Sequence, residues 1–221
     1  VRENGTGDGS TWENASGDIQ LMINDITVSG GEVWIAEGTY YPQYKAANEY
    51  HNGYPTTFRL KTFLLKNNIK LYGGFPATGN PTFNDRDWRN NVTVLSGDLG
   101  RGYECVAVVT VATETGTAVI DGLTITGEKP ELQGCTYYIW NFNFNTQYGG
   151  GIHAMVRAPG NIKLQNNIIT GNTAKMSGGG LYLFTSGGVN VDINNNVFSN
   201  NTAENGSGGG LALSSYFADN M

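Results

Sequence analysis

The chain has 221 residues, with 13 Lys and Arg against 19 Asp and Glu, and a formal net charge of −6. Its length suits one large domain with a sizeable core, and the lack of clustered basic residues argues against nucleic-acid binding. The 32 Gly and 26 Asn predict a turn-rich, all-β protein, whereas only 6 Pro and a spread of apolar residues exclude collagen-like and disordered chains.

Residues 1–30 are expected to form an N-terminal cap. Apolar residues recur at helical spacing over residues 16–28, Ser16 or Asp18 is suited to cap the start of a helix, and Gly30 follows its end. A single amphipathic helix before the first strand is suited to cover the open end of a stack of strands, which would otherwise promote aggregation.

Short apolar segments, bounded by Gly, Asn and Asp, follow the cap and are typical of strands. They are residues 32–41, 62–66, 68–75, 93–98, 105–111, 117–122 and 123–127. A long interruption at residues 42–57 separates the first two of them. Because loops of this length in a compact fold often carry function, this segment is a candidate binding loop.

A second interruption, at residues 128–148, is rich in aromatic residues interleaved with Asn and Gln. Aromatic rings beside amides are suited to stack on sugar rings and to hydrogen-bond their hydroxyl groups. The alternative is a satellite hydrophobic cluster that fastens the loop to the body of the fold. The predicted ligand-binding residues are Tyr137, Tyr138, Trp140, Phe142 and Tyr148.

The rest of the chain repeats itself. With a shift of 29 residues, 149–151 falls on 178–180 and 172–174 falls on 201–203, and with a shift of 30 a third copy opens at Gly208. Each unit holds three short strand-like segments separated by Gly, Asn and Ser. Stacking successive units would pair every strand with its equivalent about 4.8 Å away.

This repeat predicts a right-handed parallel β-helix, forming a single domain of residues 1–221 in which residues 31–221 make about six or seven coils of roughly 30 residues. Equivalent inward positions should form apolar columns, and Lys163 should lie beside Asp192 on the outside. The expected columns are Ile152/Leu181/Leu211, Ile162/Val191 and Ile169/Phe198.

Asparagine and glycine have defined places in the repeat. Asn167/Asn196 and Asn172/Asn201 should stack as hydrogen-bonded ladders in successive turns, where Asn also tolerates a left-handed backbone. The glycine triplets fit turns that need positive φ or close backbone approach. The repeat is therefore interpreted as architecture and not as a site.

Two motifs carry a family resemblance. Phe198-Ser-Asn-Asn201 matches F-x-x-N, and Ser207-Gly-Gly-Gly-Leu211 resembles G-G-A-[ILV] with Gly in place of Ala. Together they resemble the repeats of chlamydial polymorphic outer membrane proteins, and residues 63–127 resemble the first coils of large secreted β-helix proteins of Bacteroidetes. The resemblance implies a pectin-lyase-like β-helix on a bacterial cell surface, a fold that hosts both enzymes and adhesins.

β-Helix enzymes that cleave polysaccharides need grouped carboxylates, either as an acid/base pair or around Ca²⁺. The candidates are Asp85, Asp87, Asp98, Asp121 and Asp192. Caps, turns and salt bridges explain them more simply, although Asp98 and Asp121 could be neighbours on adjacent coils. His153 is expected to point outward beside Tyr182, and His51 lies in the first long loop. Because no nucleophile, phosphate or zinc motif is present, no catalytic residue, metal ligand or cofactor is predicted.

We therefore expect a non-catalytic extracellular or cell-surface module that is adhesin-like or binds glycans through its loop aromatics. The alternatives are a polysaccharide lyase or glycoside hydrolase and a purely structural spacer. Expected partners are glycans or cell-surface components, without nucleic acid, and no apolar run is long enough to span a membrane. The chain is expected to be a fragment that continues into further coils or meets a partner chain. Whether Cys105 and Cys135 form a disulfide stays open.

Overall fold

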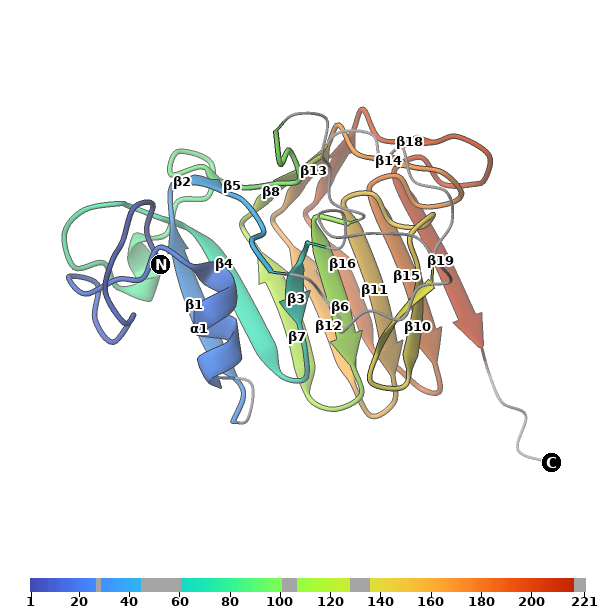
Figure 1. Cartoon of the computed structure of the whole chain (residues 1–221), viewed down its shortest axis with the longest axis horizontal. Coiled ribbons are helices and arrows are strands. Elements are labelled where there is room, and N and C mark those ends of the chain that lie inside the picture. The colour runs from blue at the N-terminus through green and yellow to red at the C-terminus, as the bar shows by residue number, and fades with distance from the viewer. Residues whose placement is uncertain (27–28, 45–60, 101–106, 128–135, 217–221) are drawn as a thin grey trace.

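The computed structural model describes residues 1–26, 29–44, 61–100, 107–127 and 136–216. In this part of the chain, three parallel sheets of five strands each run along the molecule, with the N-terminal segment at one end and residues 211–216 at the other (Figure 1). The chain visits the three sheets in a fixed order, which we number sheets I, II and III. One pass through all three is called a coil.

The strands of each sheet are given in their spatial order. Sheet I consists of β3 (Phe63–Leu65), β6 (Val109–Thr113), β11 (Ile152–Arg157), β15 (Leu181–Ser186) and β19 (Leu211–Tyr216). Sheet II consists of β1 (Gly31–Ala36), β4 (Ile69–Phe75), β7 (Thr117–Asp121), β12 (Asn161–Gln165) and β16 (Val191–Asn194). Sheet III consists of β2 (Gly38–Tyr40), β5 (Thr93–Ser96), β8 (Thr124–Thr126), β13 (Ile168–Thr170) and β17 (Val197–Ser199).

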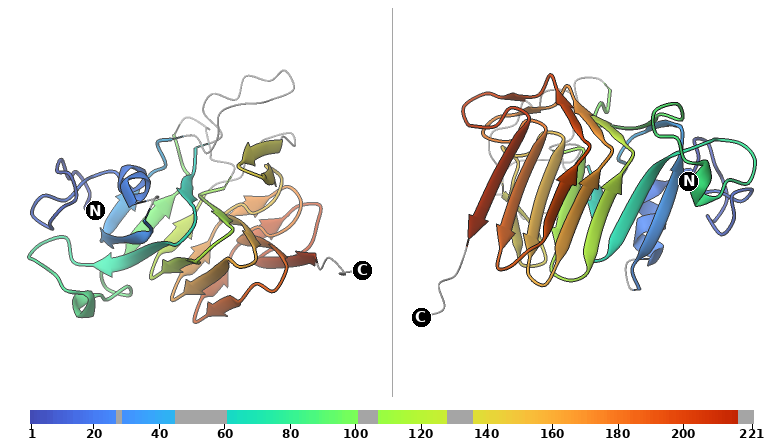
Figure 2. Two further views of the ribbon diagram at one scale, coloured as in Figure 1. Left: turned by 90° about the horizontal axis from the view of Figure 1, so that it is seen from below. Right: turned by 180° about the vertical axis from the view of Figure 1, so that it is seen from behind.

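Six smaller elements complete the description. They are the helix α1 (Ile19–Ile26), the 3-10 turn η1 (Phe83–Asp85), the short parallel pair β14 (Thr173–Ala174) and β18 (Thr202–Ala203), and the antiparallel pair β9 (Thr136–Ile139) and β10 (Phe142–Asn145). The fold is all-β with long parallel sheets, as predicted, and it is consistent with a β-helix solenoid (Figure 2). None of the helices in the described residues is long and apolar enough to cross a membrane.

The predicted register is confirmed in every column that the sequence defines. The partners are Ile152 with Leu181 and Leu211, Ile162 with Val191, Ile169 with Phe198, and Lys163 with Asp192 on the outside. The first column also continues back through Val109 to Phe63, so one apolar column runs through all five strands of sheet I. Equivalent positions of successive coils pair directly. Residues that are 29 positions apart in the sequence, which have similar side chains, therefore lie beside each other on neighbouring strands.

In the described residues each sheet has five strands, fewer than the six or seven coils expected for the whole chain. Residues 76–92 connect β4 to β5 and include η1, in agreement with a loop around Asp85 and Asp87. Of the predicted interruption at residues 42–57, only residues 42–44 belong to the described part of the chain.

The helix α1 covers the first edge of sheet I. It is shorter than the predicted 16–28, and its cap is Asp18, whose Oδ1 accepts from Leu21 N at 2.9 Å. Residues 27–28 lie outside the described part of the chain. The Gln20 side chain accepts from Leu64 N at 2.7 Å and donates to Leu64 O at 3.2 Å, so its amide satisfies backbone groups of the edge strand β3.

The two asparagine ladders form as predicted. Asn167 Nδ2 donates to Asn196 Oδ1 at 2.9 Å, and Asn172 Nδ2 donates to Asn201 Oδ1 at 3.0 Å. The left-handed backbone, however, is not adopted by these ladder residues. In the first ladder the left-handed backbone belongs to the residue before each ladder asparagine, with φ of 57° at Asn166 and 52° at Asn195.

Candidate functional site

The aromatic segment that was expected to be a loop is a β-hairpin over its described part. β9 and β10 pair through Phe142 with Ile139 and Phe144 with Tyr137, and Trp140 in the connection has φ of 52°. The hairpin lies on the outer face of sheet I beside β11 (Figure 1). Because side chains alternate along a strand, the hairpin has one face toward the sheet and one toward solvent.

The inner face is a hydrophobic cluster and confirms the fastening role that the sequence left as an alternative. Tyr137, Ile139, Phe142 and Phe144 are buried against outward-pointing residues of β3, β6 and β11. The rings of Tyr137 and Phe144 stack with centroids 5.3 Å apart. The prediction of Tyr137 and Phe142 as ligand contacts is therefore corrected, because their rings are enclosed between the hairpin and sheet I.

The outer face presents the remaining aromatic residues of the hairpin. Tyr138 is 53% exposed and Trp140 is 46% exposed. Asn143 lies directly opposite Tyr138 in the strand pair, and Asn141 is exposed at the turn. The exposed side chains of the hairpin therefore include two aromatic rings and two amides, and we call this set, Tyr138, Trp140, Asn141 and Asn143, the outer face of the hairpin.

Cationic side chains from the body of the fold hold the tip of the hairpin. Arg157 lies over the Phe142 ring, with Cζ 4.6 Å from the centroid, and its Nη2 donates to Asn141 O at 3.1 Å. Its Nη1 lies 3.5 Å from Glu114 Oε1. Lys66 Nζ lies 5.1 Å from the centroid of Trp140. These contacts limit the freedom of the tip and orient Trp140.

Tyr148 lies just beyond the hairpin and is half-buried. Its ring packs on Tyr182 of β15, with centroids 4.6 Å apart. Tyr148 therefore borders the cluster, and only its exposed part is open to a ligand. Of the five predicted residues, Tyr138 and Trp140 are the two that the structure leaves exposed. The part of the predicted loop at residues 128–135 lies outside the described residues.

His153 points outward from β11 in register with Tyr182, as expected, but it is not exposed. The rings of Phe144 and Tyr182 lie 4.8 and 5.4 Å from its ring and leave it 1% accessible. Among the described residues, His153 Nε2 has no hydrogen-bond partner. Burial lowers the pKa of His153 to about 3, so the ring is neutral at pH 7. Because the ring is enclosed, a substrate could not reach it as a catalytic base. His51 lies outside the described residues.

Three of the five candidate aspartates make local turn contacts. Asp85 accepts from the Thr82 backbone, which is the main reason that its pKa is lowered, and Asp87 accepts from the Asn90 side chain with the same effect. Asp98 Oδ1 accepts from Gly100 N at 2.9 Å. These are the cap and turn roles that the sequence favours.

Asp121 and Asp192 make contacts between coils. Asp121 Oδ1 lies 2.9 Å from Arg86 Nη2, with both side chains 11% exposed, and it also accepts from Asn166. Arg86 therefore pairs across coils and not with its sequence neighbours. Asp192 accepts from Gln165 and Asn194.

Asp121 and Asp98 are not equivalents on adjacent coils. The register partners of Asp121 are Tyr72 and Gln165 in sheet II, whereas Asp98 follows β5 of sheet III. The two carboxylates therefore belong to different turns of the fold.

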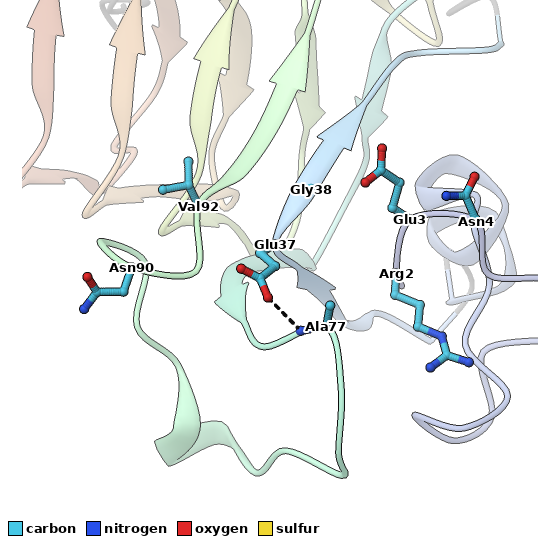
Figure 3. A pocket seen from close by; sticks show the side chains of 8 residues that line it. All are labelled: Arg2, Glu3, Asn4, Glu37, Gly38, Ala77, Asn90 and Val92. Atoms are coloured by element: carbon cyan, nitrogen blue, oxygen red, sulfur yellow. Dashed lines mark hydrogen bonds between the residues drawn. The ribbon is translucent and has the colours of Figure 1, made fainter.

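A cleft of about 670 Å³ was not found from the sequence. Its walls come from three segments that are distant in the chain, which explains why no motif indicates it. They are Arg2, Glu3, Asn4, Glu37, Gly38, Ala77, Asn90 and Val92 (Figure 3). Glu37 Oε1 accepts from Ala77 N at 3.3 Å, while Glu3 comes from the N-terminal segment. The cleft is polar and has no aromatic wall.

No group of three or more His, Cys, Asp or Glu in the described ranges is placed to hold a metal ion. Cys105 and Cys135 lie outside these ranges. Comparisons of the chain with known protein families, with curated proteins and with solved structures find no match.

Proposed function

We propose that this protein is a glycan-binding module of the bacterial cell surface, built as a right-handed parallel β-helix of the pectin-lyase-like kind. The observation that carries the proposal is the outer face of the hairpin. Tyr138 and Trp140 are each about half exposed, although the hairpin that carries them is fixed by a buried inner face. The handedness and the surface location rest on the repeat motifs and their resemblance to surface β-helix proteins.

The chemistry of the outer face fits a sugar chain. Aromatic rings offer large apolar surfaces with few rotatable bonds, so they bind the apolar faces of sugar rings at a low cost in conformational entropy. Amides such as those of Asn141 and Asn143 both donate and accept, which matches sugar hydroxyl groups. Because the hairpin is already packed on sheet I, little ordering is required upon binding.

A glycan array probed with the purified chain, followed by affinity measurements on the glycans that bind, tests this proposal. The variant carrying Tyr138→Ala and Trp140→Ala should lose about tenfold or more in affinity, because each anchor contributes roughly 1 kcal/mol or more. Tyr41→Ala is the matched control, since Tyr41 is 49% exposed and lies outside the hairpin. Equal affinity of the double variant and the control would refute the assignment of the outer face.

Cleavage of a polysaccharide is a second candidate, favoured by one observation. Glu3 and Glu37 line the same cleft, and hydrolysis of glycosidic bonds uses two carboxylates. If this candidate holds, the wild-type chain should release new reducing ends from a bound glycan and Glu37→Gln should not. If the wild-type chain binds a glycan without cleaving it, cleavage is excluded for that glycan and binding is the function.

A further inference from the structure

A second cavity, of about 410 Å³, lies between the N-terminal segment, α1 and β1. Its walls combine two tryptophans, Trp12 and Trp34, with three carboxylates, those of Asp8, Asp25 and Glu32. The cavity is separate from the hairpin and from the cleft at Gly38. Its volume falls in the range of small-molecule sites, which join apolar walls to a few polar groups.

Both tryptophan rings are held in place by the same phenylalanine. Trp34 stacks on Phe75 with centroids 4.8 Å apart and planes at 9°, and Trp12 lies 5.8 Å from Phe75. Trp12 is nine-tenths buried, and its indole Nε1 has no hydrogen-bond partner among the described residues. The contacts with Phe75 fix both indole rings in the wall of the cavity.

The charges at the cavity are predominantly negative. No Lys or Arg side chain lines it, and Lys70 pairs with Glu32 Oε1 at 3.2 Å from the neighbouring strand. Glu32 Oε2 accepts from Trp34 Nε1 at 3.2 Å, which places a carboxylate at the edge of an aromatic wall. Hydrogen bonds from Ser10 lower the pKa of Asp8, so this carboxylate is charged at neutral pH.

The amino group of Val1 does not offset these charges. It donates to Trp34 O at 2.6 Å, and burial lowers its pKa to about 6, which reduces its positive charge near neutral pH. A cation that enters the cavity therefore meets the carboxylates of Asp8 and Asp25 beside the tryptophan rings, and it shares Glu32 with Lys70.

We propose that this cavity binds an organic ammonium group, with the cation held by the aromatic walls and by the carboxylates of Asp25 and Glu32. Ammonium cations are attracted to the faces of tryptophan rings, and a nearby carboxylate adds a direct charge interaction. The group can be carried by a quaternary ammonium compound or by a protonated amino sugar, and both meet the same surface. The site shares no residue with the hairpin and is independent of its glycan binding.

Indole signals in ¹H–¹⁵N NMR spectra of the full chain test the proposal, since the four tryptophans give four signals. The probes are choline chloride and glucosamine hydrochloride, with glucose and potassium chloride as the uncharged and ionic controls. The signals of Trp12 and Trp34 should shift saturably, with a dissociation constant of about 1–10 mM. The signals of Trp88 and Trp140 should not follow that titration curve.

The two probes distinguish the sources of the ammonium group. Saturation with choline alone supports a quaternary ammonium ligand, saturation with glucosamine alone supports an amino sugar, and saturation with both supports the shared chemistry. If neither probe shifts Trp12 and Trp34 beyond the potassium chloride control, the proposal is overturned.

Charge-removing variants test the role of the carboxylates. Asp25→Asn and Glu32→Gln should each weaken binding about three- to fivefold, as expected for partly exposed charge pairs. Asp192→Asn, on the strand of sheet II farthest from β1, should bind as the wild type does. An unchanged affinity in the Asp25→Asn/Glu32→Gln double variant, with a native thermal midpoint, also overturns the proposal.

Discussion

At the scale of single residues, adjacent asparagines have different roles in the same turn. Asn166 adopts the left-handed backbone that turns the chain from sheet II to sheet III, while Asn167 is fully buried and hydrogen-bonds between coils. The sequence shows that both positions repeat, but the two roles have similar residue preferences. Only the backbone geometry assigns one role to each position.

Replacing Asn167 with Ala should lower the free energy of unfolding by about 2–3 kcal/mol, because Leu123 N and Ile120 O lose their partners in a dry interior. Chemical denaturation monitored by circular dichroism provides the measurement. Asn84→Ala, at an exposed position of η1, is the control and should change stability by less than about 0.5 kcal/mol. Similar losses in the two variants would contradict a structural role for the ladder.

His153 should make the fold sensitive to mild acid. Its pKa is about 3 when folded and 6.5 in an unperturbed chain, so the unfolded state takes up the proton first as the pH falls. The stability that comes from a neutral His153 is therefore complete above pH 6.5 and is lost progressively toward pH 3. At pH 5 the loss should be about 2 kcal/mol relative to pH 7 or above.

Denaturation midpoints of the wild type and of His153→Phe, measured between pH 7.5 and pH 5, check this expectation. The wild type should lose stability over this interval, and the variant should lose about 2 kcal/mol less. The lowered pKa values of Asp8, Asp85 and Asp87 affect both proteins alike and act at lower pH. Parallel pH profiles would show that His153 is protonated without disturbing the packing of the hairpin.

At the scale of elements, the hairpin shows what the sequence predicted and what it did not. The alternation of Tyr137, Ile139, Phe142 and Phe144 is a period-two pattern, which could have indicated two strands. The Trp140-Asn141 connection lacks the usual glycine, so no turn signal separates the strands. Which aromatic residues are buried depends on contacts with sheet I, and these lie outside any local pattern.

The stacking of coils depends on glycines that admit no side chain. A Cβ at Gly179 would collide with the carbonyl oxygens of Thr202 and Gly209 in the next coil, whereas a Cβ at Gly188 would meet nothing within 4 Å. Gly179→Ala should therefore lower stability by about 2 kcal/mol or more, and Gly188→Ala should be neutral or slightly stabilising. Thermal unfolding of the two variants gives the comparison, and a Gly179→Ala protein as stable as wild type would contradict this packing.

At the scale of the whole molecule, repetition accounts for most of what could be predicted. The columns, the ladders and the parallel pairing follow from a 29-residue spacing, because stacked coils bring identical positions together. The Asp121–Arg86 pair and the cavity beside Trp12 and Trp34 could not be predicted. Both features join segments that lie outside the 29-residue repeat. Their contacts form only once the cap and the connection at residues 76–92 have packed on sheet II.

The central claim is that the repeat is a structural framework and that the hairpin binds the glycan. The indole NMR signal of Trp140 tests this claim most directly. The chain is titrated with a glycan identified on the array, and all four tryptophan signals are followed. If the outer face of the hairpin binds the glycan, the Trp140 signal should shift saturably at the dissociation constant measured by affinity. A glycan that binds while the Trp140 signal stays in place would contradict the assignment.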